Sequence, residues 1–374
     1  MYQRNFQFWT LVALVFFVGP LLTAAEPVEV TKGTTPNQPQ QPQVFVEKSG
    51  VVHLAFGAGK EMRYCRSEDR GQTFSSPVSL PATKVFSLGM RRGPRIAVSG
   101  STICISAIGG DQGKGKDGDI LLFRSEDKGQ TWQEPVRVND TADSAREGLH
   151  AMAVSSSGEL ACAWIDLRDK RAVVMASFSQ DAGKTWSKNE LVYQSPDGAV
   201  CPCCHPSIIY DAKGRVHVMW RNALEGARDM YVATSINQGK SFGRATKLGM
   251  GTWPLNMCPM DGGGLTANDD GNLTTVWRRG SNVYLTAAKN QRERELGVGE
   301  QPCIASDGEN TYIAWLKKRG GPLMLLAPNE KTPTQLGDKA NDPSLAATDG
   351  MVVVAWESSE GNQTSIVCKR LAPE

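Results

Sequence analysis

The sequence has little net charge, because 41 lysine and arginine residues stand against 39 aspartate and glutamate residues in a chain of 374, for a formal net charge of +2. This balance gives no electrostatic reason to expect nucleic acid or an anionic membrane as a partner. The glycine-rich loop 109–119 lacks the G-K-[ST] sequence and the following helix of a phosphate-binding loop, and the chain lacks any amphipathic helical pattern of useful length. What it does contain is 38 glycines and 20 prolines, which predict many turns and an all-β chain.

Only one segment is apolar enough to concern a membrane. An apolar run from Phe8 to Leu22 follows the basic Arg4 and ends in small residues up to Ala25, as in a secretory signal peptide. An uncleaved anchor is the alternative, but the run is short for a span and Gly19-Pro20 breaks it. We expect residues 1–25 to be removed and the mature chain, without a membrane span, to be secreted or periplasmic.

A strand–turn–strand pattern repeats through the rest of the chain. In each copy a proline or its substitute precedes a short apolar strand, a tight glycine-containing turn follows, and a second strand ends in an aromatic residue. A third strand follows each hairpin, and a fourth follows in the better copies. In the second copy Ile108 takes the place of the aromatic residue. The copies cover residues 42–56, 94–108, 150–164, 206–220, 263–277, 302–315 and 343–356.

Repeats of about 40–55 residues with four short strands each predict a β-propeller. Seven copies tile residues 42–374, so we predict seven blades, with a six-bladed ring as the alternative. The last copy ends after its third strand, and the stretch 28–31 could supply the missing outer strand. The expected organisation is a signal peptide (1–25), a Pro/Gln-rich N-terminal segment (26–41) and one propeller domain (42–374).

A second motif, S-x-D-x-G-x-T-[WF], lies between third and fourth strands. Three full copies contain Asp69, Asp127 and Asp181, and a weaker copy contains Asn237. The carboxylate can accept hydrogen bonds from loop N–H groups, glycine supplies the positive φ, and the aromatic ring packs the turn onto the blade. Because the constellation recurs four times while an active site needs it once, we interpret these residues as structural.

On these motifs the chain resembles the sialidase superfamily and its Asp-box (BNR) repeat proteins. The resemblance covers the propeller, with the Asp boxes in its first four units, and implies that these turns lie on the face opposite the binding site. It implies two candidate functions: an exo-α-sialidase-type glycoside hydrolase acting on terminal acidic sugars, or a non-catalytic propeller that binds glycan or protein. The expected partner is an extracellular glycan or glycoprotein, and no cofactor is required.

Charged residues of both signs gather in the loops at the predicted binding face. A sialidase grips the substrate carboxylate with three arginines, since the planar guanidinium donates two parallel hydrogen bonds. The nearest match to the family's R-I-P motif is Arg92-Gly93-Pro94, which makes Arg92 a candidate. Arg221 and Arg278 are candidates by position alone, as are the acidic Asp166 and Asp261. The alternative is a solvated rim of mutual ion pairs.

The nucleophile is missing from its expected place. In the family a tyrosine opens a late blade, whereas residues 301–303 and 342–344 read Q-P-C and D-P-S here. Tyr231 and Tyr284 are the only tyrosines expected to approach the rim. The catalytic residues therefore stay unassigned, and whether the protein is an enzyme stays open.

Nine cysteines, an odd number, include a cluster at the start of two neighbouring units. We expect four cysteines and a histidine to meet there: Cys201, Cys203, Cys204, His205 and Cys258. Three interpretations are open: disulfides, with Cys203 or Cys204 pairing outward to Cys258; a copper or zinc site; and a redox-active or nucleophilic thiol. The C-P-C-C-H spacing is not a standard zinc pattern, so no metal is firmly predicted. The other cysteines fit strand interiors as small core residues.

Overall fold

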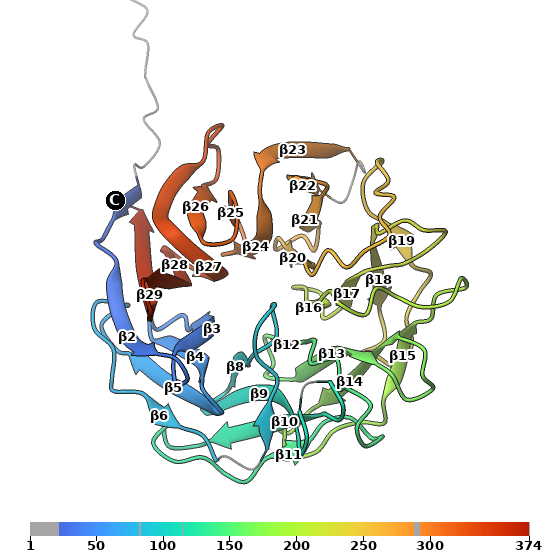
Figure 1. The fold of residues 1–374 in the computed structure, drawn as a ribbon, viewed down its shortest axis with the longest axis horizontal. Coiled ribbons are helices and arrows are strands. Elements are labelled where there is room, and N and C mark those ends of the chain that lie inside the picture. Colours follow the sequence, from blue (N-terminus) through green and yellow to red (C-terminus); the bar gives the residue numbers. More distant parts are fainter. Residues whose placement is uncertain (1–21, 82–83, 114, 288–291, 374) are drawn as a thin grey trace, which may run out of the picture.

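The computed structural model describes residues 22–373 except 82–83, 114 and 288–291, and every regular element in these residues is a β-strand. Most of the predicted signal peptide lies outside the described residues. Within them, no helix exists that could span a membrane. The strands form sheets arranged in a ring around a centre, as Figure 1 shows, so the predicted all-β propeller architecture is confirmed.

Four sheets have four antiparallel strands each, in simple chain order. The first is β3 (Pro39–Val46), β4 (Val52–Ala58), β5 (Glu61–Ser67) and β6 (Val78–Ser79). Another is β12 (His150–Val154), β13 (Leu160–Asp166), β14 (Val173–Ser179) and β15 (Glu190–Tyr193). The next is β16 (Ser207–Tyr210), β17 (Val216–Arg221), β18 (Met230–Ser235) and β19 (Thr246–Lys247). The last is β20 (Gly263–Ala267), β21 (Leu273–Arg279), β22 (Asn282–Ala287) and β23 (Glu293–Val298).

A fifth sheet lies between the first two and contains an additional short strand. Its strands are β7 (Val85–Phe86), β8 (Arg95–Ser99), β9 (Thr102–Gly110), β10 (Asp119–Ser125) and β11 (Val136–Arg137). Both β7 and β8 pair with β9. The short β7 lies ahead of β8 in the chain, and the loop between them contains Arg91 and Arg92.

The remaining strands form one continuous sheet of eight strands. Its strands are β24 (Glu300–Ser306), β25 (Thr311–Leu316), β26 (Gly321–Leu326), β27 (Thr334–Thr348), β28 (Met351–Glu360), β29 (Gln363–Pro373), β2 (Val28–Thr34) and β1 (Leu22–Ala24). The long β27 joins its two halves, because residues 334–340 pair with β26 and residues 340–348 pair with β28. The outermost strands β1, from the end of the predicted signal peptide, and β2, from the N-terminal segment, both pair with β29.

The blade count is not confirmed as predicted. Five sheets have the size of a single blade, and the sixth is a continuous eight-stranded sheet instead of separate blades. The physical reason is β27, an extended strand of 15 residues that runs from the outer edge of one half into the inner edge of the other without a loop.

The hairpin repeat read from the sequence sets the strand register. His150 pairs with Trp164, and Gly263 pairs with Trp277, so the proline position and the aromatic position of a copy face each other across the first two strands. The aromatic side chains are buried between sheets, with Trp164 and Trp220 fully inaccessible. The first strands thus start beside the ends of the second strands, all at one edge of the ring.

Apolar clusters between neighbouring sheets hold the ring together. One cluster joins Ala163 and Trp220 across the sheets that start with β12 and β16. Another joins Leu54 and Phe56 on β4 to Val353 on β28 and Ile366 on β29. The second cluster seals the chain's first sheet to its last one. Closure of this kind leaves no long sheet edge exposed.

Candidate functional site

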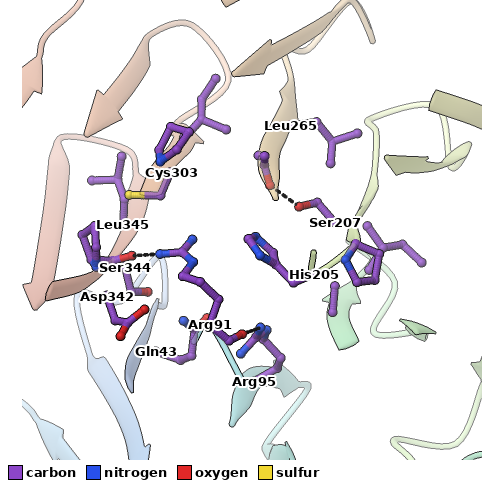
Figure 2. A pocket seen from close by; sticks show the side chains of 18 of the residues that line it. Gln43, Arg91, Arg95, His205, Ser207, Leu265, Cys303, Asp342, Ser344 and Leu345 are labelled. Carbon is purple, nitrogen blue, oxygen red and sulfur yellow. Dashed lines mark hydrogen bonds between the residues drawn. The ribbon is translucent and has the colours of Figure 1, made fainter. Parts of the chain in front are cut away.

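A cavity of about 220 Å³ opens at the centre of the ring. It is lined by residues near the start of the innermost strands β3, β8, β12, β16, β20 and β24 and by residues 342–345 in the second half of β27. Antiparallel pairing places the beginnings of all first strands at the same edge, which is why residues far apart in sequence meet there. Figure 2 shows Arg91, Arg95, His205 and Asp342 turned toward this cavity.

The backbone is distorted where three of these strands enter the cavity. Gln41, Gln301 and Asp342 each precede a proline and adopt φ values of 56°, 51° and 44°. The strand register shifts at each of these places, as in a β-bulge. A bulge re-aims a side chain, and a left-handed residue other than glycine costs about 1–3 kcal/mol. The fold therefore accepts strain at three places that border one cavity.

Three arginines supply positive charge to the lining. Arg91 Nη1 donates to the carbonyl of Pro343 (3.2 Å), and Arg92 Nε donates to the carbonyl of Glu147 (2.7 Å). Arg95 donates to the carbonyls of Arg91 (3.0 Å) and Pro94 (2.7 Å). Among the described residues, none of the three forms an ion pair with a carboxylate within 4.0 Å. Their positive charge is thus left for a ligand.

One carboxyl group, Asp342, borders the same cavity. Gln301 holds it in both directions: Gln301 Nε2 donates to Asp342 Oδ1 (3.0 Å), and the Asp342 N–H donates to Gln301 Oε1 (2.9 Å). Burial raises the pKa of Asp342, although the charge of Arg91 opposes the shift. Glu357 on β28 accepts from the Gln41 N–H (2.6 Å). Burial and the charge of Asp342 raise the pKa of Glu357 to about 8.

Two further polar atoms in the lining are buried without a partner in the described residues. They are Nε2 of Gln41 and Nδ1 of His205. Gln41 Oε1 accepts from the Gly89 N–H (2.7 Å), which fixes the amide. Burial and the charges of Arg91 and Arg95 lower the pKa of His205 well below its ordinary value, so its ring is neutral. Unpaired buried polar atoms are rare in proteins and point to a missing ligand or water.

Gly93 makes the close approach of Gln41 possible. It has a φ of 93°, and a Cβ there would lie 2.9 Å from both Cβ and Oε1 of Gln41. A larger residue would push the Gln41 amide out of its place. The close approach of Gln41 therefore explains why Gly93 replaces the isoleucine of the R-I-P pattern.

The three predicted arginines do not form one clamp. Arg92 lines the cavity, but Arg221 and Arg278 are not among the lining residues. Arg221 is buried and donates to the carbonyls of Asp261 (3.0 Å), Arg228 (2.6 Å) and Arg278 (2.9 Å). Arg278 pairs with Glu300 at 2.8 Å. The positions of these arginines in the sequence were compatible with joint binding of a carboxylate. In the structure their guanidinium groups instead donate to backbone carbonyls and to Glu300.

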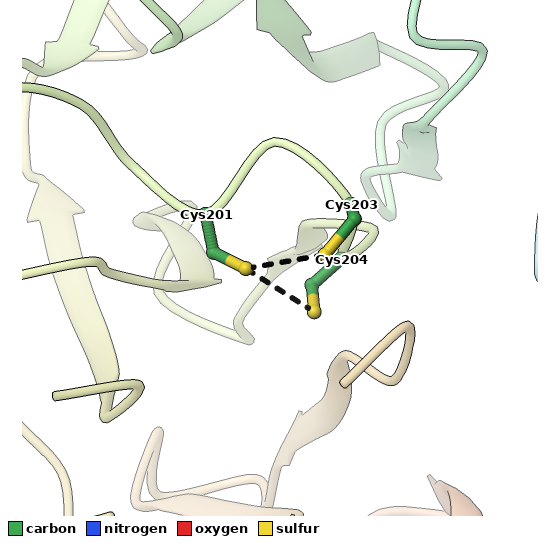
Figure 3. A group of neighbouring side chains, drawn as sticks. All are labelled: Cys201, Cys203 and Cys204. Carbon is green, nitrogen blue, oxygen red and sulfur yellow. Dashed lines mark hydrogen bonds between the residues drawn. The ribbon is translucent and has the colours of Figure 1, made fainter. Parts of the chain in front are cut away.

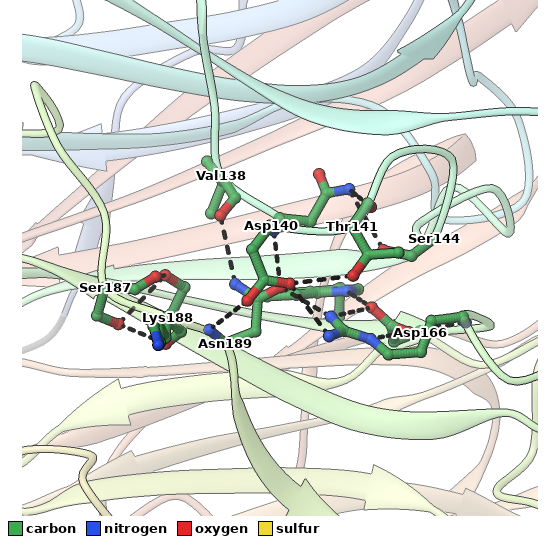
Figure 4. Close-up of polar contacts among 12 residues, drawn as sticks. Val138, Asp140, Thr141, Ser144, Asp166, Ser187, Lys188 and Asn189 are labelled. Atoms are coloured by element: carbon green, nitrogen blue, oxygen red, sulfur yellow. Dashed lines mark hydrogen bonds and ion pairs between the residues drawn. The ribbon is translucent and has the colours of Figure 1, made fainter.

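The two acidic candidates are both fully buried and lie outside the lining. Asp166 accepts from Trp164 Nε1 (2.8 Å) and from Arg168 Nε (2.9 Å). Figure 4 shows Asp166 within an inter-sheet network, where Asp140 and Asn189 exchange hydrogen bonds. These contacts indicate that Asp166 stabilises the fold.

Asp261 lies next to the cavity wall. Its Oδ2 accepts from the Gln301 N–H (2.8 Å), and its Oδ1 has no partner among the described residues. Burial raises the pKa of Asp261, although the charge of Arg91 opposes the shift. It supports Gln301, which in turn positions Asp342.

No tyrosine lines the cavity within the described residues. Tyr231 stacks on Trp220 and Tyr193. Tyr284 Oη donates to Glu295 Oε2 (3.0 Å), but this tyrosine–glutamate pair joins β22 and β23, the two outer strands of its sheet. The pair is therefore remote from the innermost strands that line the cavity.

The cysteine cluster divides into two parts. Cys201, Cys203 and Cys204 are buried together, with Cys201 Sγ 3.4 Å from Cys203 Sγ and 3.7 Å from Cys204 Sγ. His205 turns into the central cavity instead, and Cys258 is exposed. All nine cysteines are free thiols in the structure, so the expected disulfides are not seen.

The comparisons with known proteins agree with this geometry. Residues 107–279 match the family model of the BNR repeat-like domain. The fold is a β-propeller similar to that of solved sialidase structures. A comparison of this chain with curated proteins finds no match.

Solved structures of three different proteins have a similar fold. A protein of unknown function from Dyadobacter fermentans has a TM-score of 0.58 at 16% identity, over 94% of this chain and 99% of that one. An α-L-arabinofuranosidase from Fusarium graminearum has 0.59 at 12%, over 93% and 98%. A sialidase from Trypanosoma rangeli has 0.55 at 15%, over 94% and 60%. Identities this low show the fold alone.

The Asp boxes of this propeller are turns at the other end of the sheets. Asp69 Oδ1 accepts from the N–H groups of Gln72 (3.0 Å) and Thr73 (2.9 Å), and Oδ2 accepts from Thr73 Oγ1 (2.6 Å). The residues of the other boxes repeat this pattern, with Asn237 donating its side-chain amide to Ser241. Every oxygen of the Asp69 carboxylate is thus used within its own turn.

Several residues of the site were missed by sequence reasoning, namely Gln41, Arg95, Gln301 and Glu357. A signal for Glu357 was present, because it directly follows Trp356 just as Arg221 follows Trp220 and Arg278 follows Trp277. A signal for Gln41 and Gln301 was the recurring Gln-Pro dipeptide at the start of a copy. For Arg95 no signal existed, since its proximity to the cavity depends on the preceding loop.

Proposed function

We propose that this BNR propeller binds the terminal acidic sugar of an extracellular glycan in its central cavity and hydrolyses the glycosidic bond. The observation that carries the proposal is the set of three arginines in the lining that have no carboxylate partner among the described residues. A guanidinium group prefers a carboxylate, to which it donates two parallel hydrogen bonds. Gln41 Nε2, buried and unpartnered, offers a further donor to a sugar oxygen.

The proposed proton donor is Asp342. Hydrolysis of a glycoside needs a carboxylic acid to protonate the leaving oxygen, and the acid must keep its proton near the working pH. Burial raises the pKa of Asp342 and favours its protonated form. Its rate contribution should be present at low pH and be lost as the pH rises through this raised pKa. Glu357 shares the same environment and keeps a second carboxyl group close to the first.

The similar structures support the carbohydrate class only in general terms. Structures of similar fold include an α-L-arabinanase from Penicillium chrysogenum in complex with arabinobiose and the Trypanosoma rangeli sialidase in complex with sialic acid. The first sugar is neutral and the second is acidic, so the fold accommodates both. The arginines of this cavity favour the acidic class for this chain.

Export of the chain is part of the proposal, because its glycan substrate would lie outside the cytoplasm. The apolar run ending near Ala25 supports a cleaved signal peptide. N-terminal sequencing of the protein recovered from the periplasm or medium should start near Glu26. Recovery of an intact Met1 terminus from membranes would contradict export in soluble form.

A second candidate function is non-catalytic glycan binding through the same cavity. It is favoured by a specific observation: no tyrosine lines the cavity in the described residues, so the usual sialidase nucleophile has no counterpart there. In that case Asp342 would accept hydrogen bonds from the ligand instead of donating a proton during a reaction.

One assay separates these outcomes. The chain starting at Glu26 is incubated with fluorogenic glycosides of an α-linked sialic acid, a β-linked uronic acid and a neutral arabinofuranose, beside Arg92→Ala and Asp342→Asn variants. Release from an acidic substrate that Asp342→Asn abolishes supports the hydrolase. Binding of acidic sugars by calorimetry without release supports the binding propeller. Release from the neutral substrate alone, or neither binding nor release, would overturn the proposal.

A further inference from the structure

Three buried thiols face one another in the loop between β15 and β16. Cys201, Cys203 and Cys204 each expose 9% or less of their surface, and all three sulfur atoms lie within 4.8 Å of one another. Figure 3 shows the sulfur atoms converging on the inside of this loop. The proposed hydrolysis uses none of them, because its groups lie in the central cavity.

Residues at the end of β17 hold this loop in place. The Cys201 N–H donates to the carbonyl of Arg221 (3.0 Å), and Val200 forms a β-bridge with Asn222. Arg221 in turn ties three other loop segments through its guanidinium group. The positions of the thiols therefore depend on the rigid end of β17 and not on a freely moving loop.

The spacing of the sulfur atoms suits one metal ion. With a metal–sulfur bond of about 2.3 Å, two sulfur ligands of a tetrahedral or trigonal site lie about 3.8–4.0 Å apart. The observed separations of 3.4 and 3.7 Å from Cys201 Sγ need only small side-chain adjustments to reach this value. A disulfide would need about 2.05 Å, and any single disulfide would leave one of the three thiols buried without its partner.

A second sulfur-rich loop covers the cluster. Met260 packs against the three cysteines, whereas Cys258 on the same loop is exposed and lies outside their group. Met257 on the same loop is 66% exposed. The nearest imidazole in the sequence, His205, is not part of the sulfur cluster and points into the cavity. The surroundings therefore offer thiol and thioether sulfur and no nitrogen ligand.

We propose that Cys201, Cys203 and Cys204 bind one Cu(I) ion, with Met260 of the facing loop as a covering thioether. Soft thiolate and thioether ligands select Cu(I), whereas structural zinc sites use four cysteine or histidine ligands and do not use methionine. Each thiol that binds releases its proton to solvent. The guanidinium of Arg221 lies near Cys204 and offsets part of the negative charge that three thiolates bring. The inference stands independently of the proposed hydrolysis.

The test uses the full chain, reduced and kept under anaerobic conditions, and titrated with Cu(I) against a chromophoric Cu(I) chelator. We expect one ion per chain, and X-ray absorption should show sulfur-only coordination. Cys203→Ser and the Cys201→Ser/Cys204→Ser double variant should each weaken Cu(I) binding by more than about 100-fold. This loss exceeds the one expected for residues that contact the ligands without binding the metal themselves. Cys303→Ser is the matched control, because this cysteine lies outside the cluster and should leave binding unchanged.

Other results would overturn the inference. They are retained Cu(I) binding in Cys203→Ser, a nitrogen ligand in the absorption spectrum, or preference for Zn²⁺ over Cu(I) in direct competition. Mass spectrometry provides a second measurement that does not depend on the variants folding. A disulfide among these cysteines that persists in the native protein, or a covalent haem on the Cys201-x-x-Cys204-His205 spacing, would equally contradict it.

Discussion

At the Asp-box end of the sheets, Asp69 and Asp127 are half-buried, and their oxygens are occupied by donors from their own turns. At the cavity end, Asp342 is also half-buried, but it lies beside arginines that form no ion pair among the described residues. Hydrogen bonds from Thr131 and Ser125 lower the pKa of Asp127 to about 2, whereas burial raises the pKa of Asp342. Aspartates thus stabilise turns at one end of the sheets, whereas at the other end an aspartate lies beside arginines that can still bind a ligand.

The difference shows how to separate structural from functional acids in a repeat protein. An acid that recurs in several units with all its partners in the same turn contributes to stability. An acid that occurs once, on a strained backbone and beside unpaired charge, is a candidate for ligand binding. The following predictions would break or sharpen this distinction.

The largest effect is expected from Asp342→Asn. Loss of a general acid should lower turnover of an acidic glycoside by about 10²- to 10⁴-fold. The matched Asp69→Asn variant should keep full activity, because its side chain serves only a turn. Steady-state kinetics of both variants measure the contrast, and equal losses would contradict the assignment of the two ends.

A smaller loss is expected when an arginine of the cavity is neutralised. Arg91→Gln should weaken binding of an acidic sugar by about 10- to 100-fold, as expected for hydrogen bonds between charged groups. The control is Arg279→Gln, since Arg279 is already paired with Glu293. Calorimetric titration checks both. If Arg279→Gln weakened binding as much as Arg91→Gln, the cavity would not be the site.

The Asp-box end should respond in stability and not in activity. A Cβ at Gly183 would collide with the buried Leu122 side chain of the preceding sheet, and Gly183 also has a φ of 83°. Gly183→Ala should cost about 1–3 kcal/mol for overpacking beyond the cost of the backbone conformation. Gly214→Ala isolates the backbone cost, because Gly214 has a φ of 72° and open space around it. Equal unfolding free energies for the two variants would contradict the inter-sheet contact.

The smallest effect should be seen in the pH dependence of stability. The pKa of Glu357 is raised to about 8 in the folded protein, so its contribution is fully present below its ordinary pKa and is lost as the pH rises through about 8. The pKa of Asp127 is lowered, so its contribution is present above its ordinary pKa and is lost as the pH falls toward about 2. Thermal unfolding from pH 3 to 9 should flatten at the alkaline end in Glu357→Gln and at the acid end in Asp127→Asn. If both variants flattened the stability profile at the same end of the pH range, the contrast between the two acids would be contradicted.

Much of the architecture could be predicted because it depends on local patterns. The spacing from a proline to an aromatic residue fixes which residues pair, and the Asp-box motif fixes the turn that follows the third strand. The number of blades could not be predicted in the same way. It depends on β27, where an outer strand continues directly into an inner strand although the turn-forming residues Gly337, Asn341 and Pro343 in this stretch predict a loop.

The site was predicted only in part, because its members meet through tertiary structure. Arg92 was found through a motif, whereas Gln41 and Gln301 became relevant through bulges and left-handed backbone that aim their amides at the cavity. Arg221 and Arg278 lie at the expected ends of strands, but their hydrogen-bond partners are carbonyl groups and Glu300, which no spacing reveals.

The most direct test of the central claim is a pair of calorimetric titrations of the wild-type chain. One uses a terminal acidic sugar, and the other uses the same sugar with its carboxylate converted to a neutral carboxamide. Unpaired arginines in the cavity predict that the carboxamide binds about 10- to 100-fold more weakly, and that Arg91→Gln removes most of this difference. Equal affinity for the two sugars, or no binding of either, would contradict an acidic-sugar site in the cavity.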